Sequence, residues 1–322
     1  MILCCGEALI DMIPVPQAQG GDAFVPHCGG AVFNTAIALG RLGVRTGLMT
    51  GLSTDMFGRQ LTEALAASGV DASLAVTSDR PSTLAFVRLV NGAAAYSFFD
   101  NGSAGQMLTV DQMPALTEET SALYFGGISL ACEPAADAYA ALSAREGGSR
   151  AVMIDPNIRP AFIEDEARYR ARLDGMIAAA DIVKASDEDL NWLVRSDAPL
   201  RDKARSLMET GASVLIVTRG HEGAHGYLAS GEEVHVNAQQ VEIIDTVGAG
   251  DTFNAGVLAK LQERDALTKE GLASLSTSDL RDALSLGARV AAVTVSRAGA
   301  NPPWASEIEP MNDASPRRTH SA

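Results

Sequence analysis

The chain has 322 residues, 47% of them hydrophobic, which is typical of a globular protein with a sizeable core. Its 40 acidic residues outnumber its 25 Lys and Arg, and the net charge of −15 argues against nucleic acid or an anionic membrane as the main partner. No signal peptide or membrane-spanning run is recognisable, and the cysteines match neither a zinc pattern nor a disulfide framework, so we expect reduced thiols and a cytoplasmic location.

The first residues predict a buried strand at Met1–Cys5 that continues as extended chain over Ile10–Val15. Asp11 interrupts this apolar stretch, and a carboxylate there must find polar partners. Asp11 either makes a local hydrogen bond in a loop or accepts hydrogen bonds from the hydroxyls of a ligand.

Gly29 and Gly30 then open a helix that we expect to end at Gly40 or Leu42. A tight strand–helix turn explains the two glycines. It does not explain Asn34, because asparagine is mildly unfavourable inside a helix, so a polar task for this side chain is expected.

A β-rich region follows a strand at Arg45–Gly51 and a helix at 57–68. Two runs, Ser82–Val90 and Ala94–Phe99, flank an Asn-Gly pair that is typical of a tight β-hairpin. The hairpin interrupts the alternation of strands and helices, so we expect it to lie outside the main sheet.

From Leu123 the chain alternates between strands and helices, which predicts an α/β fold: a three-layer, doubly wound, mostly parallel sheet. The expected strands are Leu123–Phe125, Ala151–Ile154, Asp181–Lys184 and Val214–Thr218, with a hairpin of Gly226–Leu228 and Glu233–Val236. The expected helices are Glu133–Ala144, Ala249–Gln262 and Asp279–Val295.

The stretch 241–257 contains the pattern that most clearly predicts a chemical function. Val241, Ile243 and Ile244 indicate a short strand, and a Gly-Ala-Gly turn then leads into a helix. A helix N-terminus suits an anion, and glycines let the backbone approach it. Asp251 in the first turn either complements the helix dipole or accepts a proton from a group that attacks a phosphate.

Two segments resemble the signatures of the ribokinase (pfkB-type) family of carbohydrate kinases. Asp245–Phe253 resembles the C-terminal signature and Gly29–Gly43 the N-terminal one, and the resemblance runs from about Cys4 to Trp304. It implies one ribokinase-like domain over 1–322, a small β-sheet lid from about 11–28 and 80–102, and a frayed tail at 306–322.

The resemblance also implies roles for individual residues. Asp251 would be the catalytic base, with the anion hole at Gly248, Ala249 and Gly250. Sugar binding would involve Asp11, Gly29, Gly30, Asn34, Phe99, Arg159 and Asp251. The ATP site would include Lys184, Ser186, Thr218, Gly220, Gly223, Gly248, Gly250 and Ala288.

Ion sites are expected in two places. Relatives have Asn-x-x-Glu where this chain has Ser186–Asp189, so Asp189 either completes a helix capping box or serves Mg²⁺ through water. A monovalent cation, K⁺, would be held near Asp245, Val247, Arg297 and Gly299.

The function implied by the resemblance is an ATP-dependent sugar kinase that uses Mg²⁺, with a homodimer formed through the lid. The run Phe98–Ala104 resembles bacterial fructokinases, so D-fructose is the expected sugar. The alternatives are 2-keto-3-deoxygluconate, a nucleoside as acceptor, or a catalytically silent member of the family.

Overall fold

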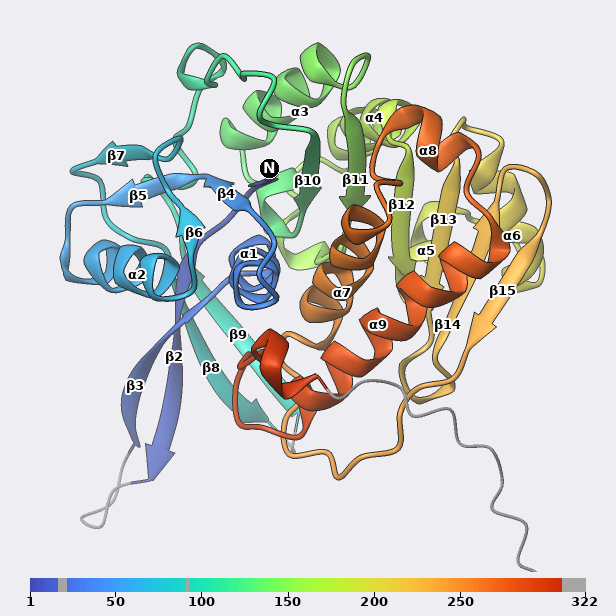
Figure 1. The fold of residues 1–322 in the computed structure, drawn as a ribbon. Helices are drawn as coiled ribbons and strands as arrows, with labels where there is room; N and C mark the ends of the chain where they lie inside the picture. The colour runs from blue at the N-terminus through green and yellow to red at the C-terminus, as the bar shows by residue number, and fades with distance from the viewer. Residues whose placement is uncertain (17–21, 91–92, 309–322) are drawn as a thin grey trace, which may run out of the picture.

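The computed structural model describes residues 1–16, 22–90 and 93–308 (Figure 1), and side chains of all of these except 16, 22, 88–90 and 93–96. Within this part, nine strands form the main sheet. Their order is β15 (Glu233–Val236), β14 (Ala224–Leu228), β13 (Val214–Thr218), β12 (Ile182–Ser186), β11 (Ala151–Asp155), β10 (Ala122–Gly126), β1 (Ile2–Cys5), β4 (Thr46–Met49) and β6 (Val70–Asp71). The strands from β13 to β6 are parallel, whereas β14 pairs antiparallel with β13 and β15 pairs antiparallel with β14.

Helices cover both faces of this sheet (Figure 1). One face carries α1 (Ala31–Arg41), α2 (Met56–Ala67), α7 (Ala249–Glu263), α8 (Lys269–Ala273) and α9 (Thr277–Val295). The other carries α3 (Ala135–Glu146), α4 (Glu166–Ala179), α5 (Asp187–Leu193) and α6 (Leu200–Met208). Successive residues of a strand point to opposite faces, so Ile2 and Cys4 join one buried cluster and Leu3 and Cys5 the other. The predicted three-layer α/β arrangement is confirmed.

A second sheet projects beside the main one (Figure 1). It consists of β3 (Asp22–Gly29), β2 (Leu9–Pro16), β8 (Leu84–Val90) and β9 (Ala93–Phe99). The strands β8 and β9 pair antiparallel, as the predicted hairpin requires, and the Asn91-Gly92 turn itself lies outside the described residues. A small third sheet pairs β5 (Gly51–Ser53) with β7 (Val76–Ser78).

The order of the strands reverses next to β1. From β1 the chain proceeds to β4 and β6 on one side, and from β10 outward through β13 on the other. In open parallel sheets this reversal leaves a crevice at the carboxyl ends of the strands, where ligands bind.

One predicted strand is wrong. Residues 241–244 belong to an irregular segment, and Ile243 and Ile244 are each 62% exposed. The backbone N–H groups of Ile244 and Asp245 donate to the carbonyl of Val295 at 2.8 and 3.2 Å, at the end of α9. The segment therefore satisfies its hydrogen bonds on a helix end, and its apolar residues do not form a strand.

The remaining differences are small. The predicted strand 45–51 is divided between β4 and β5, and α8 lies in a stretch that we expected to be irregular. In the expected tail, Ala305–Glu307 forms a 3₁₀ turn, and residues 309–322 lie outside the described part. No helix among the described residues is long and apolar enough to cross a membrane.

Candidate functional site

A cavity of about 480 Å³ lies at the carboxyl ends of the central strands, where the N-termini of α1 and α7 meet them. Its lining brings together residues from distant parts of the sequence, including Asp11, Asn34, Asp155, Lys184 and Asp251. A larger hollow of about 720 Å³ lies near Met1 and the last turns of α1 and α7, and no predicted site residue lines it.

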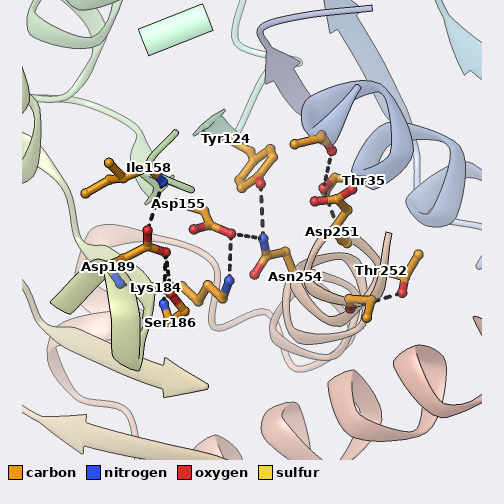
Figure 2. Close-up of polar contacts among 12 residues, drawn as sticks. Thr35, Tyr124, Asp155, Ile158, Lys184, Ser186, Asp189, Asp251, Thr252 and Asn254 are labelled. Carbon is orange, nitrogen blue, oxygen red and sulfur yellow. Dashed lines mark hydrogen bonds and ion pairs between the residues drawn. The ribbon is translucent and has the colours of Figure 1, made fainter. Parts of the chain in front are cut away.

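Asp251 lies in the first turn of α7 and is 8% exposed. Its Oδ2 accepts a hydrogen bond of 2.9 Å from Asn34 Nδ2, and its backbone carbonyl accepts one of 3.0 Å from Thr35 Oγ1 (Figure 2). These bonds fix α7 against α1. They also give Asn34 the polar task that its place in a helix predicted.

The surroundings of Asp251 raise the pKa of its carboxyl group toward neutral pH. Burial raises its pKa to about 7, and the negative charge of Asp155 acts in the same direction. The hydrogen bond from Asn34 and the positive charge of Lys184 partly offset this. A carboxylate with such a pKa can accept a proton at physiological pH more readily than an ordinary aspartate.

Two glycines need their positive φ angles and the space beside them. Gly248 is the N-cap of α7 with φ 76°, and a Cβ there would lie 2.7 Å from the Cβ of Ala300. Gly30 is the N-cap of α1 with φ 107°, and a Cβ there would lie 2.9 Å from the carbonyl oxygen of Glu7. Both helix N-termini border the cavity, where the N–H of Ala31 donates to Glu7 Oε1 at 3.0 Å and that of Ala249 to the carbonyl of Thr246 at 3.3 Å.

Asp11 enters the cavity from β2. Burial raises its pKa to about 6. Gly29 does not line the cavity, but a Cβ on it would lie 2.1 Å from Asp11 Oδ2, so Gly29 leaves room for that carboxylate.

The prediction for Phe99 requires a correction. Phe99 is 62% exposed and does not line the cavity, whereas its neighbour Phe98 does. Neighbouring side chains of a strand point to opposite faces of the sheet, so only one of the two can face the site. Phe98 packs edge-on against Phe162, with ring centroids 4.3 Å apart.

The predicted nucleotide residues divide into two groups. Lys184 and Ser186 at the end of β12 and Thr218 at the end of β13 line the cavity. Gly220 and Gly223 lie in the turn after β13, and Ala288 packs in the core from α9, so these three do not line it. Arg159 lines the cavity and is exposed there, with Nη1 donating to the carbonyl of Ile158.

Asp189 forms the predicted capping box with Ser186, which donates to Oδ2 through N–H and hydroxyl at 3.1 and 2.7 Å. Its Oδ1 accepts the N–H of Ile158 at 2.9 Å (Figure 2). That bond holds the turn in which Asn157 adopts a φ of 43°. These contacts favour the capping interpretation.

The two loops expected to hold a monovalent cation lie side by side. Asp245 Oδ1 accepts the N–H of Val247 at 3.0 Å, and Oδ2 accepts that of Gly299 at 2.8 Å. The carbonyl of Gly299 also accepts the N–H of Asn301 at 2.8 Å. Arg297 pairs with Glu307.

Sequence reasoning missed two buried polar residues of this region. Glu7 lines the cavity and accepts N–H bonds from Ala31 and Ser129 at 3.0 and 3.2 Å. Asn254 donates to Asp155 Oδ2 at 2.7 Å and to the hydroxyl of Tyr124 at 3.0 Å (Figure 2). The argument applied to Asn34, a polar residue in a helix interior, would have found Asn254. Glu7 lies in the turn between β1 and β2, where a polar residue is ordinary, so the local pattern gives no signal for it.

Comparison with known proteins agrees with this geometry. The model of the pfkB family carbohydrate kinases matches residues 1–307. A fructokinase of Rhizobium leguminosarum bv. trifolii is 50% identical over 88% of this chain and 86% of its own length. A probable fructokinase-4 of Arabidopsis thaliana is 32% identical over 97% and 96%.

Solved structures resemble the fold over nearly the whole chain. The fructokinase of Xylella fastidiosa with bound ATP has a TM-score of 0.86 and 28% identity, covering 95% of this chain and 96% of that one. An aminoimidazole riboside kinase of Salmonella enterica, in complex with aminoimidazole riboside and an ATP analogue, has a TM-score of 0.80 and 25% identity over 93% and 94%. The chain therefore belongs to the pfkB family of carbohydrate kinases.

Proposed function

We propose that this chain is an ATP-dependent fructokinase with Asp251 as its catalytic base. The observation that carries the proposal is a buried carboxylate, held by Asn34 at a glycine-rich helix N-terminus, with a pKa of about 7. The 50% identity to a fructokinase over most of both chains supports the choice of sugar.

The proposed chemical step uses Asp251 and the other residues that line the cavity. Asp251 accepts the proton of the attacking sugar hydroxyl, whose oxygen bonds to the γ-phosphorus while the bond to the β–γ bridging oxygen breaks. The backbone amides of 248–250 stabilise negative charge on the transferring group. On the sugar side, Asp11 and Asn34 bind hydroxyls, with Gly29 and Gly30 shaping their surroundings. Phe98 takes the place that we expected for Phe99.

The nucleotide would extend from Gly248 and Gly250 along the ends of β12 and β13. Lys184, Ser186 and Thr218 offer polar contacts to its phosphates within the cavity. Gly220, Gly223 and Ala288 lie beyond the cavity, where we assign them to the nucleoside portion.

The charges around the cavity fit a divalent cation. Among the described residues, the cavity is lined by two cations, Arg159 and Lys184, and by six carboxylate side chains: Glu7, Asp11, Asp155, Glu188, Asp189 and Asp251. A polyphosphate entering such a site needs further positive charge, which Mg²⁺ supplies while it orients the phosphate oxygens. Asp189 and Glu188 line the cavity, and we assign to them the water ligands of this ion.

A K⁺ site near Asp245 fits less directly. Both oxygens of that side chain already accept backbone N–H groups, so the oxygen ligands would be carbonyls of Asp245, Val247, Arg297 and Gly299. We infer that K⁺ steadies the loop that packs on Gly248. Equal rates in K⁺ and in a large organic cation, at matched ionic strength, would contradict this assignment.

Fructose is favoured over a sugar acid by the charges near the sugar side. Asp11 and Asp251 face that side, and a substrate carboxylate near them would cost on the order of 1 kcal/mol at 4 Å even in water. Of the two lining cations among the described residues, Lys184 is paired with Asp155, which leaves Arg159 to pair with such a carboxylate or with the phosphate.

The experiment is a coupled assay of ADP release with D-fructose and 2-keto-3-deoxygluconate under the same Mg·ATP and K⁺ conditions. We expect kcat/KM for fructose to be at least about tenfold higher, a difference of ~1.4 kcal/mol in transition-state binding. A ratio at or below one would mean that Arg159 faces the sugar. No turnover with any sugar or nucleoside would indicate a catalytically silent relative.

A nucleoside kinase is the second candidate, because the Salmonella riboside kinase is similar over 93% of this chain. The same assay with aminoimidazole riboside and adenosine distinguishes it. Turnover of either one above that of fructose would replace the proposal.

The four-stranded sheet is proposed to act as a lid over the sugar, since Asp11 and Phe98 reach the cavity from it. Its opposite face exposes Phe99, which we propose as part of a homodimer contact. The cysteines of the described residues are unpaired, which supports the proposed cytoplasmic location.

A further inference from the structure

The larger hollow of about 720 Å³ lies at the amino ends of β1 and β4, and we call it the amino-edge hollow. Its wall consists of residues 42–45, which join α1 to β4, the last turns of α7 and the middle of α9. These helices lie on one face of the sheet (Figure 1). The cavity that Asp251 lines is at the carboxyl ends of the strands, and the two share no lining residue.

The amino-edge hollow has a positive lining in a chain that is strongly negative. Among the described residues, three cations line it, Arg45, Lys260 and Arg289, against one carboxylate, Glu263. The net charge of the whole chain is −15, so this local excess of cations runs against the composition. The carbonyl end of α7 borders the hollow, but its dipole is equivalent to only about half a negative charge. The remaining charge suits an anion.

Arg289 is the cation of this hollow that lacks a partner within the described part of the chain. Its side chain is partly buried, yet it makes no hydrogen bond or ion pair there. By contrast, Lys260 Nζ pairs with Glu263 Oε2 at 2.7 Å, and Arg45 pairs with Glu119. A guanidinium group that has lost part of its water needs acceptors in exchange, and its planar fork of N–H donors matches a carboxylate or a phosphate.

The rest of the lining suits a ligand that is larger than a bare ion. Leu42, Val44 and Leu286 pack on the hydrophobic core at the wall of the hollow and can cover the uncharged part of a ligand. The two ion pairs of the lining are exposed, since the side chain of Arg45 is 64% exposed and that of Glu263 is 62% exposed. Such pairs contribute little free energy, so their cations can turn toward a stronger anion.

We propose that the amino-edge hollow binds a small organic phosphate, with Arg289 as the main ligand of the phosphate group and Lys260 and Arg45 as further cations. A phosphate monoester carries about −1.5 to −2 charge at pH 7 and three acceptor oxygens, so it matches several cationic donors better than a single carboxylate does. Its organic part lies against the apolar side chains of the wall. The site is separate from the proposed kinase reaction, because none of these residues lines the cavity of Asp251.

The test titrates three probes into the full-length protein by calorimetry, at a saturating concentration of ADP. D-glucose 6-phosphate carries both parts of the proposed ligand, inorganic phosphate carries only the charged part, and D-glucose carries only the uncharged part. The variants are Arg289→Gln and, as a matched control, Arg281→Gln. Arg281 also lies on α9, but it donates to the carbonyl of His235 and does not line the hollow.

We expect D-glucose 6-phosphate to bind the wild type with a Kd below about 1 mM, and inorganic phosphate to bind at least about threefold more weakly. Arg289→Gln should weaken the sugar phosphate by about tenfold or more, as for loss of a charge-assisted contact, and Arg281→Gln by less than about twofold. Any binding of D-glucose should be the same in all three proteins. Both variants should keep the kcat and KM of the wild type, since neither residue lines the cavity of Asp251.

An equal Kd of the sugar phosphate for the wild type and Arg289→Gln would overturn the proposal, because the phosphate would then be bound elsewhere. Absence of binding to the full-length wild type would overturn it as well, and equal affinities for inorganic phosphate and the sugar phosphate would leave an adventitious ion only. Arg289→Lys, which keeps the charge but not the planar fork, should bind the sugar phosphate between the wild type and Arg289→Gln. The binding measurements need no turnover, so they remain decisive even if the proposed kinase function fails.

Discussion

The buried carboxylate of Asp251 is suited to accept a proton, but its ionised form destabilises the folded protein. Replacing it by Asn keeps the shape and lets the side chain turn its oxygen toward Asn34, but it removes the proton acceptor. We expect Asp251→Asn to lower kcat by about two to four orders of magnitude, the range for general-base catalysis, while ADP binds as before. Steady-state kinetics and calorimetric titration with ADP would measure both effects.

The folding of this variant gives an independent control. Because the pKa of Asp251 is raised from 3.8 to about 7 in the folded state, the wild type loses stability as pH rises between these two values, whereas Asn stays neutral. The variant should therefore melt higher than the wild type at pH 8, have a smaller advantage at pH 5 and have none below the lower pKa. A kcat within a few-fold of the wild type would remove Asp251 from the mechanism.

The two raised pKa values predict the acid limb of the pH profile. Asp251, with a pKa of about 7, and Asp11, with a pKa of about 6, must both be ionised, one to accept a proton and one to bind hydroxyls. The slope of log kcat/KM for the sugar should be near one just below pH 7 and should approach two below pH 6. Asp11→Asn should weaken sugar binding and keep a slope of one throughout. If the slope for the wild type stays near one at every pH below 7, ionised Asp11 is not required for sugar binding.

At the scale of single residues, the sequence singled out Asp11 and Asn34 because each is polar at a position where the local pattern expects an apolar or strong helix-forming residue. It singled out Asp251 because that residue follows a Gly-Ala-Gly turn at a helix N-terminus. It did not distinguish Phe98 from Phe99. Which of two adjacent strand residues faces the cavity depends on the register of β9 against β8, in which Phe99 lies opposite Leu84. That register is a property of the folded sheet.

At the scale of elements, the turn before α7 depends on contact with the C-terminal loop. Gly248→Ala would place a Cβ 2.7 Å from that of Ala300 in addition to straining a residue with φ 76°. Gly43→Ala is a matched control, since Gly43 has φ 81° and a Cβ there meets nothing within 4 Å. The backbone strain alone costs roughly 1–2 kcal/mol in each variant.

Only Gly248→Ala should displace the amides that we assign to the transferring phosphoryl group. We expect it to lower kcat at least about tenfold, less than the loss of a complete oxyanion-hole donor, and Gly43→Ala to leave kcat unchanged. Melting temperatures of the two variants would show whether their stability losses are comparable. Similar kcat values for both would mean that the position of this turn does not limit catalysis.

The predicted strand at 241–244 is wrong, although it lies next to the glycine turn before α7 that the sequence did predict. Three apolar residues before a glycine turn are typical of a strand, but this segment joins none of the sheets among the described residues. The end of α9 accepts its backbone N–H groups instead. Local periodicity carries no information about which acceptors the rest of the fold leaves free.

At the scale of the whole molecule, the layers follow from the alternation of strands and helices, and the topology agrees with that expectation. The alternation did not reveal that β1 lies inside the sheet, between β10 and β4. This interior position creates the reversal of strand order, and with it the crevice that Glu7, Asp155 and Lys184 line. Contacts between residues so distant in sequence are not encoded in local patterns.

The outer face of the four-stranded sheet predicts how two molecules associate. Phe24 and Phe86 stack edge-on with centroids 5.0 Å apart, Phe86 and Phe99 follow at 5.4 Å, and Phe99 remains 62% exposed. Phe24 and Phe86 are partly buried, and an aromatic row that ends in an exposed ring is compatible with an interaction surface. Phe98, the residue before Phe99, lines the cavity. A dimer through this face would therefore couple dimer formation to sugar binding.

We expect wild-type protein to form a concentration-dependent dimer and Phe99→Ser to shift it toward monomer by about tenfold or more in Kd, as for loss of an interface anchor. Val110→Ser is the control, because Val110 is 54% exposed in a 3₁₀ turn outside this sheet. Sedimentation equilibrium measures the association, and KM for the sugar reports the coupling. If all three proteins are monomers at every concentration, the lid closes over the sugar without a partner, and KM for Phe99→Ser should equal that of the wild type.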